Sequence, residues 1–225
     1  MKVRGKRRSY RSGKPVYKKY RHTDELLPSF ESRKEAIRRR LAEFALVPPD
    51  QYFYELVYCL LTPQSSAVNA SQVVLKLQEA SFLEKGDDAT FVLNNRAHYI
   101  RFHNTKARHL QIARERFPVI AASLANGTAS TEMREWLVHN VKGLGWKEAS
   151  HFLRNIGHKD LAILDRHILK NLRRHGVLRK MPKSLTPSRY LKIESDFREF
   201  ARTIGVTMDE LDLLFWSNET GEILK

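Results

Sequence analysis

Apolar residues recur along most of the chain with the three- and four-residue spacing of amphipathic helices. No segment alternates convincingly as a strand, and no internal repeat is evident. Pro118 is expected to end one helix, and another is expected to begin near Ser32 and stop before Pro48. The pattern predicts an all-α fold with a helix from Asp165 to a stop at Gly176 and further helices over residues 52–61, 66–77, 104–117, 131–141, 147–156, 189–204 and 208–216.

Length and composition narrow the class of protein. With 225 residues, 42% of them hydrophobic, the chain can bury a core in one domain or in two interleaved lobes. Its single cysteine, Cys59, lies in an apolar segment and excludes an intrachain disulfide, a four-cysteine zinc site and a four-cysteine iron–sulfur cluster. No apolar run approaches the roughly 20 residues needed to span a bilayer, and the basic N-terminus lacks the apolar segment of a secretory signal. We therefore expect a soluble, cytoplasmic protein.

The formal charge of +15 is concentrated at the N-terminus. Residues 1–22 contain ten Lys or Arg and no acid, which leaves 30 basic and 25 acidic residues, a net of +5, in the rest. Residues 1–29 are predicted to form a disordered tail, because they have too little apolar surface to offset the entropy of ordering. The tail is either an arm that adds salt-sensitive affinity for nucleic acid or a solubilising segment without a defined partner.

A glycine-containing turn joins the helices predicted over residues 131–141 and 147–156. It contains Val141, Lys142, Gly143, Leu144 and Gly145. The glycines permit backbone torsions in which consecutive N–H groups converge on one phosphate oxygen, beside the positive end of the next helix. This order predicts a helix-hairpin-helix that binds a DNA backbone through Lys142, Gly143 and Gly145. The alternative is an ordinary tight turn between packed helices.

A lysine and an aspartate follow this turn. Lys147 begins the second helix, where the helix dipole disfavours another positive charge and so favours a neutral, nucleophilic amine. Asp165 lies 18 residues further on and begins the next helix, where a carboxylate is a good N-cap. Beside an amine nucleophile, the same carboxylate could accept a proton or stabilise positive charge on a sugar ring. The alternative for Lys147 is a solvated lysine in a first helical turn.

Two segments carry a family resemblance. They read KEASHFLRNIG from Lys147 and LAILDRHIL from Leu161, and they closely resemble the archaeal and bacterial type 2 8-oxoguanine DNA glycosylases of the helix-hairpin-helix, Gly/Pro-rich-loop, aspartate superfamily. The similarity covers about residues 30–225, and the missing cysteines separate the chain from the endonuclease III and adenine-glycosylase branches. The resemblance implies two helical lobes, the second built from the N- and C-terminal helices, with the active site in the cleft between them.

The resemblance also implies a bifunctional glycosylase and lyase. Lys147 would attack C1′ of the damaged nucleotide, Asp165 would assist its deprotonation and stabilise the oxocarbenium-like sugar, and β-elimination would cut the strand. No metal or organic cofactor is expected, and no pair of histidines has metal-ligand spacing. The expected partner is damaged double-stranded DNA, bound by a monomer associated with the nucleoid.

Recognition of the flipped base is expected from residues far from the hairpin in sequence. The resemblance implies that Phe102 and Trp216 hold the base and that Lys225 contributes its main-chain carboxylate. Gln64 lies at a helix junction where superfamily members fill the gap left by the base. The alternatives are core packing for the aromatics, a frayed terminus for Lys225 and a polar loop for Gln64.

The predicted function is removal of 8-oxoguanine followed by cleavage of the abasic site. A glycosylase and lyase for another damaged base, and a non-catalytic helix-hairpin-helix DNA-binding protein, are the alternatives. The presence of both Lys147 and Asp165 argues against the last, because backbone binding needs neither.

Overall fold

The computed structural model describes residues 19–223, which form helices and loops without a strand. The all-α prediction is therefore confirmed. The α-helices are α1 (Thr23–Glu31), α2 (Lys34–Ala45), α3 (Tyr52–Leu61), α4 (Ala67–Glu79), α5 (Phe82–Lys85), α6 (Thr90–Leu93), α7 (His103–Ala125), α8 (Ser130–Asn140), α9 (Trp146–Asn155), α10 (Arg166–Arg174), α11 (Pro187–Ile204) and α12 (Met208–Thr220). Two 3-10 turns, η1 (Pro49–Gln51) and η2 (Arg96–His98), accompany them.

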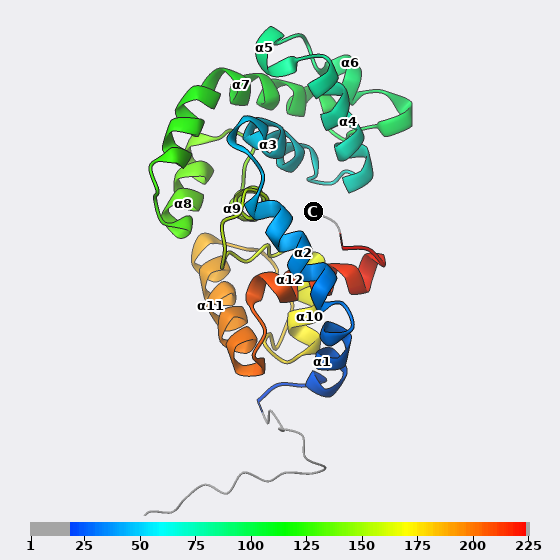
Figure 1. Ribbon diagram of the computed structural model, residues 1–225, viewed down its shortest axis with the longest axis vertical. Coiled ribbons are helices and arrows are strands. Elements are labelled where there is room, and N and C mark those ends of the chain that lie inside the picture. The colour runs from blue at the N-terminus through cyan, green and yellow to red at the C-terminus, as the bar shows by residue number, and fades with distance from the viewer. Residues whose placement is uncertain (1–18, 224–225) are drawn as a thin grey trace, which may run out of the picture.

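Two hydrophobic cores divide these helices into two lobes (Figure 1). The first core runs from Phe53 to Leu161 and is built by α3 to α9. The second combines residues from Tyr20 to Phe44 with residues from Ala162 to Phe215, so α1 and α2 pack with α10, α11 and α12. The chain thus leaves the second lobe after α2, builds the first, and returns.

Helix α9 connects the lobes. Its residues from Ala149 to Asn155 are all buried. Arg154 extends toward the second lobe, where its guanidinium lies 4.8 Å from the Phe44 ring centroid and donates to Asp212 at 3.0 Å. Gly157 follows the helix with a φ of +92°, and a Cβ there would lie 2.9 Å from the Cα of Ala45. Only glycine allows this approach, which fixes the end of α9 against the end of α2.

Part of the predicted tail belongs to the folded protein. Helix α1 occupies Thr23–Glu31, and Tyr20 contacts the Phe200 ring edge-on at 4.7 Å. Leu26 and Phe30 are buried one helical turn apart. The high charge of the flanking residues conceals this short apolar stripe in the sequence. The predicted disordered tail, residues 1–29, was therefore wrong for residues 19–29, which belong to the second lobe. Residues 1–18 lie outside the described residues.

Two helix boundaries also differ from the predictions. Helix α7 continues through Pro118 to Ala125, because Ile120 is buried in the first core and extends the apolar face past the proline. Helix α2 has Arg33 rather than Ser32 at its N-cap, since the Ser32 hydroxyl donates to the Ser29 carbonyl at 2.9 Å. Most other boundaries match to within about two residues.

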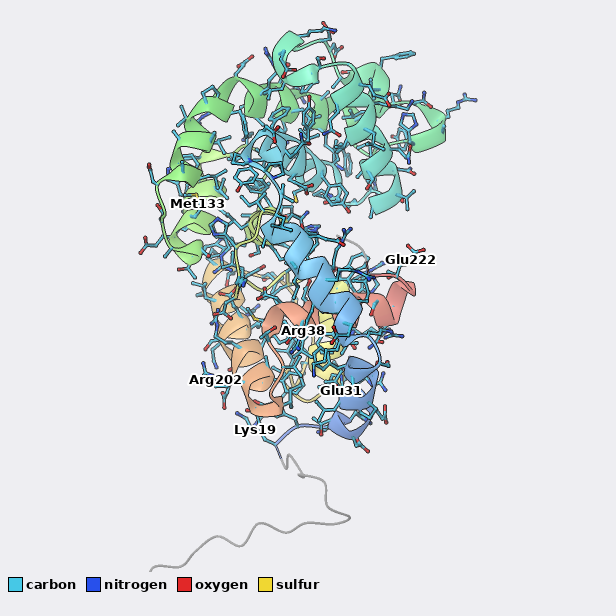
Figure 2. The ribbon with its side chains drawn as sticks, in the orientation of Figure 1. Lys19, Glu31, Arg38, Met133, Arg202 and Glu222 are labelled. Carbon is cyan, nitrogen blue, oxygen red and sulfur yellow. The ribbon has the colours of Figure 1, made fainter. Side chains whose placement is uncertain are left out.

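Packing of α2 on α12 completes the second lobe. Arg38, which Figure 2 labels on α2, forms a 2.8 Å ion pair with Glu210 on α12. Glu210 also accepts from the backbone N–H of Thr207, whose hydroxyl in turn accepts from the Glu210 N–H. This capping box fixes the start of the helix that carries Trp216.

Candidate active site

A cavity of about 670 Å³ is lined by residues of both lobes. The first lobe contributes the loop between α3 and α4 and one face of α9, and the second contributes the start of α10 and one face of α12. Its lining residues are Tyr58, Thr62, Gln64, Ser65, Ala67, Arg101, Lys147, His151, Arg154, Ile163, Asp165, Arg166, His167, Asp212 and Trp216. The cavity therefore brings together Lys147, Asp165, Trp216 and Gln64 of the residues singled out from the sequence.

Lys147 enters the cavity from the second residue of α9. Its side chain is 30% exposed, and its Nζ forms an ion pair with Glu148 Oε1 at 3.2 Å. The amine is thus accessible to a ligand, and the carboxylate of Glu148 is already beside it. Glu148 itself is only 15% exposed, so its carboxylate is partly desolvated next to the amine.

Both oxygens of Asp165 are held by N–H donors. Oδ1 accepts from the backbone N–H groups of His167 and Ile168, each at 2.8 Å, which makes Asp165 the N-cap of α10 as predicted. Oδ2 accepts from Trp216 Nε1 at 2.9 Å. These three hydrogen bonds fix the carboxylate in the cavity, so that capping and a role toward a ligand are compatible.

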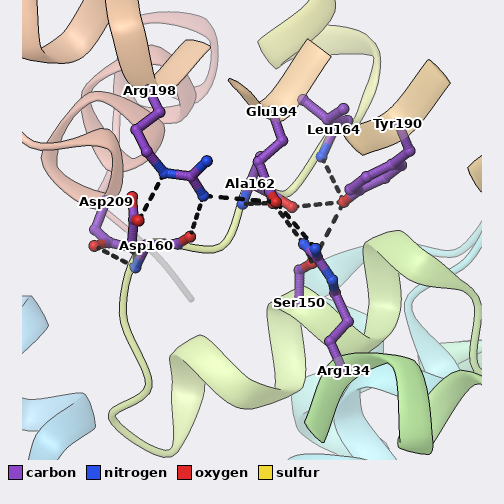
Figure 3. Close-up of polar contacts among 9 residues, drawn as sticks. All are labelled: Arg134, Ser150, Asp160, Ala162, Leu164, Tyr190, Glu194, Arg198 and Asp209. Carbon is purple, nitrogen blue, oxygen red and sulfur yellow. Dashed lines mark hydrogen bonds and ion pairs between the residues drawn. The ribbon is translucent and has the colours of Figure 1, made fainter. Parts of the chain in front are cut away.

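A buried network holds the loop between α9 and α10, which ends at Asp165 (Figure 3). Arg134 on α8 donates to both carboxylate oxygens of Glu194 on α11. Glu194 also accepts from the Ala162 N–H at 2.8 Å. The hydroxyl of Tyr190 donates to the Ala162 carbonyl and accepts from the Leu164 N–H. Three hydrogen bonds from α11, two to Ala162 and one to Leu164, therefore hold this loop in place.

The cavity is lined by an excess of positive charge. It contains Arg101, Lys147, Arg154 and Arg166 against Asp165 and Asp212, four cationic groups and two carboxylates. Such a surface attracts a phosphate backbone.

Asp212 is the more deeply buried of these carboxylates. Its Oδ2 accepts from Arg154, while Oδ1 has no hydrogen-bond partner among the described residues. Burial raises the pKa of Asp212 to about 7, opposed by Arg154 and assisted by the negative charges of Asp165 and Asp209.

One of the two glycines in the hairpin between α8 and α9 has the left-handed backbone that only glycine adopts easily, and the other is extended. Gly143 has a φ of +89°, and a Cβ there would meet His109 Nδ1 at 2.3 Å. Gly145 has an extended backbone and forms the N-cap of α9 without a side-chain hydrogen bond. The first N–H groups of α9 are therefore available to an anion. Lys142 is exposed beside them, and burial, Lys142 and Arg108 together lower the pKa of His109.

Gln64 and Phe102 both adopt left-handed backbone conformations, with φ values of 56° and 60°. Gln64 lines the cavity. Phe102 is half exposed at the N-cap of α7, and it is the adjacent Arg101, not Phe102, that lines the cavity in this structure. Lys225 lies outside the described residues.

Several lining residues were not singled out as site residues from the sequence. His151 and Arg154 lie four and seven residues after Lys147, on one face of α9, and Asp212 lies one turn before Trp216 on α12. Helical spacing from the two expected residues was thus a usable signal. Arg101 gave no such signal, because it precedes α7 and reaches the cavity through tertiary packing alone.

Two further structural observations concern metals and membranes. Within residues 19–223, no group of three or more His, Cys, Asp or Glu side chains is arranged to hold a metal ion. No helix in this range has the length and apolar composition to cross a membrane.

An all-helical two-lobed chain with a helix-hairpin-helix and with lysine and aspartate in one basic cavity defines a helix-hairpin-helix DNA glycosylase. The family model described as 8-oxoguanine DNA glycosylase matches residues 37–206. The chain belongs to this family.

Individual relatives agree with this assignment. An 8-oxoguanine DNA glycosylase/AP lyase from Korarchaeum cryptofilum is 42% identical over 193 residues, covering 85% of this chain and 91% of that protein. One from Fusobacterium nucleatum is 38% identical over 220 residues, covering 92% and 100%. The crystal structure of the Methanocaldococcus jannaschii 8-oxoguanine DNA glycosylase has a TM-score of 0.80 at 31% identity, covering 91% and 98%. That enzyme in complex with 15mer DNA containing 8-oxoguanine has a TM-score of 0.79 at 31% identity, covering 89% and 100%.

Proposed function

We propose that this protein excises 8-oxoguanine from double-stranded DNA and cleaves the resulting abasic site, with Lys147 as the nucleophile and Asp165 as its charge-stabilising partner. The observation that carries the proposal is that Lys147, Asp165 and Trp216 line one basic cavity. Lys147 also lies in the first turn of α9, whose N-terminus has no side-chain cap. The solved relative bound to 8-oxoguanine DNA supports the choice of lesion.

The first chemical step replaces the bond from C1′ to the base nitrogen with a bond from C1′ to Lys147 Nζ. The base leaves with the bonding electrons and takes up a proton. Positive charge develops on the sugar ring meanwhile, and the fixed carboxylate of Asp165 offsets it in a partly water-excluded site. Lys147 needs a neutral amine for this attack, and Glu148, 3.2 Å away, is the nearer acceptor for its proton.

The second step cleaves the strand. Ring opening of the lysine–C1′ adduct gives a protonated Schiff base, and loss of a C2′ proton expels the 3′ phosphate by β-elimination. The hairpin formed by Lys142, Gly143 and Gly145 binds the backbone near the lesion, where the open N–H groups at the start of α9 donate hydrogen bonds to a phosphate.

The residues that we propose for base recognition are those that the family resemblance implies. Trp216 supplies a flat surface inside the cavity, and Phe102 supplies a second one after a movement of its exposed side chain. Gln64 fills the gap in the duplex, and the main-chain carboxylate of Lys225 contacts the base edge. All chemical groups in this account come from one chain, which supports the proposal of a monomer, and a DNA substrate places its proposed action at the nucleoid.

Borohydride trapping tests the proposal. Duplexes containing 8-oxoguanine, thymine glycol or an abasic site are incubated with the full-length protein and sodium borohydride, which reduces a Schiff base to a stable adduct. We expect an adduct with 8-oxoguanine and abasic DNA that Lys147→Gln abolishes. Lys159→Gln, an exposed lysine outside the cavity, serves as the matched control and keeps the adduct.

The outcomes separate the alternatives. An adduct that persists in Lys147→Gln contradicts the nucleophile assignment. An adduct formed with thymine glycol but not with 8-oxoguanine contradicts the lesion. The absence of adduct and cleavage on every duplex indicates a non-catalytic DNA-binding protein.

A further inference from the structure

A buried lysine outside the reaction chemistry holds the loop that carries Gln64. Lys106 lies on α7 and is only 6% exposed. Its Nζ donates to the Leu61 carbonyl at 2.6 Å, the Pro63 carbonyl at 2.7 Å and the Ser65 hydroxyl at 3.1 Å. An ammonium has three N–H donors, so these three acceptors use all of them.

The cation of Lys106 is buried without an ion-pair partner in the described part of the chain. Burial lowers the pKa of Lys106 to about 8; Glu148 acts in the opposite direction and Lys147 in the same one. Burying a charge with only dipolar partners is costly, and lysine is among the residues least often found inside a protein. The three acceptors that offset this cost all belong to the segment from Leu61 to Ser65, which points to a local purpose for the ammonium.

The loop that Lys106 binds has an unfavourable backbone. Gln64 has a φ of 56°, in the left-handed region, where a side chain crowds the backbone and raises the conformational energy of a non-glycine residue. The acceptors of Lys106 lie on both sides of Gln64, at Leu61, Pro63 and Ser65. The hydrogen bonds from one ammonium to these three acceptors hold the loop in its turn and offset the conformational energy of the left-handed residue. Gln64 is then fixed at the wall of the cavity.

Ser65 connects Lys106 to a second segment that lines the cavity. The Ser65 hydroxyl also accepts from the Arg101 N–H at 3.1 Å. Arg101 lines the cavity, and Phe102, which follows it, has a left-handed backbone as well. The Lys106 ammonium and the Ser65 hydroxyl thus join two strained corners, each carrying a residue with a proposed role beside the flipped base.

We propose that Lys106 is a positioning residue, which holds Gln64 where it replaces the flipped base in the duplex and, through Ser65, holds the Arg101–Phe102 corner beside it. The inference rests on the proposed function. Extruding a base from a duplex requires the vacated stack to be filled, whereas a base in a single strand needs no such replacement. Loss of Lys106 therefore affects duplex DNA selectively.

The experiment compares single-turnover excision from an 8-oxoguanine duplex with excision from the same oligonucleotide as a single strand. In Lys106→Met, which keeps an unbranched side chain one heavy atom shorter and removes its donors, we expect the duplex rate to fall by a factor of ten or more and the single-strand rate by less than a factor of three. Lys76→Met, an exposed lysine on α4, is the matched control and retains both rates.

A double-mutant comparison tests whether Lys106 acts through Gln64. Gln64→Ala should show the same duplex-selective loss, and adding Lys106→Met should reduce the duplex rate by less than a further factor of three. Equal loss on duplex and single strand overturns the inference, because a general structural defect predicts it. The inference is also overturned if the double mutant loses duplex rate by the product of the two single-mutant factors, because the two residues then act independently.

A second variant and readout cover a failure of Lys106→Met to fold. Ser65→Ala removes the acceptor shared by Lys106 and Arg101 and should reduce the fluorescence rise of a 2-aminopurine placed beside the lesion at saturating protein. An unchanged rise contradicts the inference. If the wild-type protein releases no 8-oxoguanine from any substrate, the proposed function fails instead, and the two failures are therefore distinguishable.

Discussion

Replacement of Glu194 by glutamine tests whether the buried network places the loop that ends at Asp165. Glu194 is 2% exposed and Arg134 is fully buried. The carboxylate accepts from both Arg134 Nη atoms and from the Ala162 N–H. Glutamine keeps the size of the side chain, but it leaves the guanidinium without its counter-charge and turns one acceptor into a donor that faces other donors.

The expected loss follows from the depth of the pair. Removing one partner of a buried ion pair costs about 3–5 kcal/mol, because a charge stays buried without compensation. That is a large part of the roughly 5–15 kcal/mol that stabilises most domains. For a chain of this size, each kcal/mol lowers Tm by about 2–4 °C, so Glu194→Gln should melt roughly 6–20 °C below the wild type.

Urea unfolding followed by circular dichroism measures this loss, and single-turnover excision on folded protein measures its effect on the site. Glu199→Gln is the matched control, since it lies on the same helix and its ion pair with Lys19 is exposed. We expect it to unfold at the wild-type urea concentration. A loss below about 1 kcal/mol in Glu194→Gln would refute the reasoning, as would an equal loss in both variants.

Two further predictions concern the hairpin and the buried carboxylate. Gly143→Ala should weaken duplex binding in fluorescence anisotropy, because its φ of +89° disfavours alanine and the new Cβ would meet His109; wild-type affinity would contradict this. Burial raises the pKa of Asp212 from 3.8 to about 7, so its contribution to stability is complete below pH 3.8 and is lost as the pH rises through 7. Asp212→Asn should flatten that part of the urea-midpoint profile, and parallel profiles would argue against the shift.

The sequence predicted the helices well where apolar spacing and stop residues agreed. The range 52–61 coincides with α3, and Asp165 caps α10 through two backbone N–H groups as expected. The prediction failed at Pro118, where tertiary packing of Ile120 sustains a helix that a local rule ends. It also failed for residues 19–29, because Leu26 and Phe30 form too short an apolar stripe to stand out beside so much charge.

Site residues could be predicted from the sequence only where they belong to a recognisable motif. Lys147 and Asp165 were identified by their position relative to the hairpin, and the structure places both in the cavity. Glu194 and Arg134 are 60 residues apart and share no periodicity, so only the folded chain reveals their contact. Lys106 reads from the sequence as one more charge on a basic helix, and its burial is a consequence of how α3 packs against α7.

The hydrogen bond from Trp216 to Asp165 has a consequence for how such an enzyme changes over evolution. In the proposed mechanism the indole offers a surface to the base and also fixes the carboxylate that faces the sugar, so substrate choice and turnover depend on one side chain. A mutation that reshapes this surface to admit another lesion also loosens the carboxylate and slows bond breaking for every substrate. New specificity is therefore more accessible through Gln64 and Arg101, which line the same cavity and form no hydrogen bond or ion pair with Lys147 or Asp165 within the described residues.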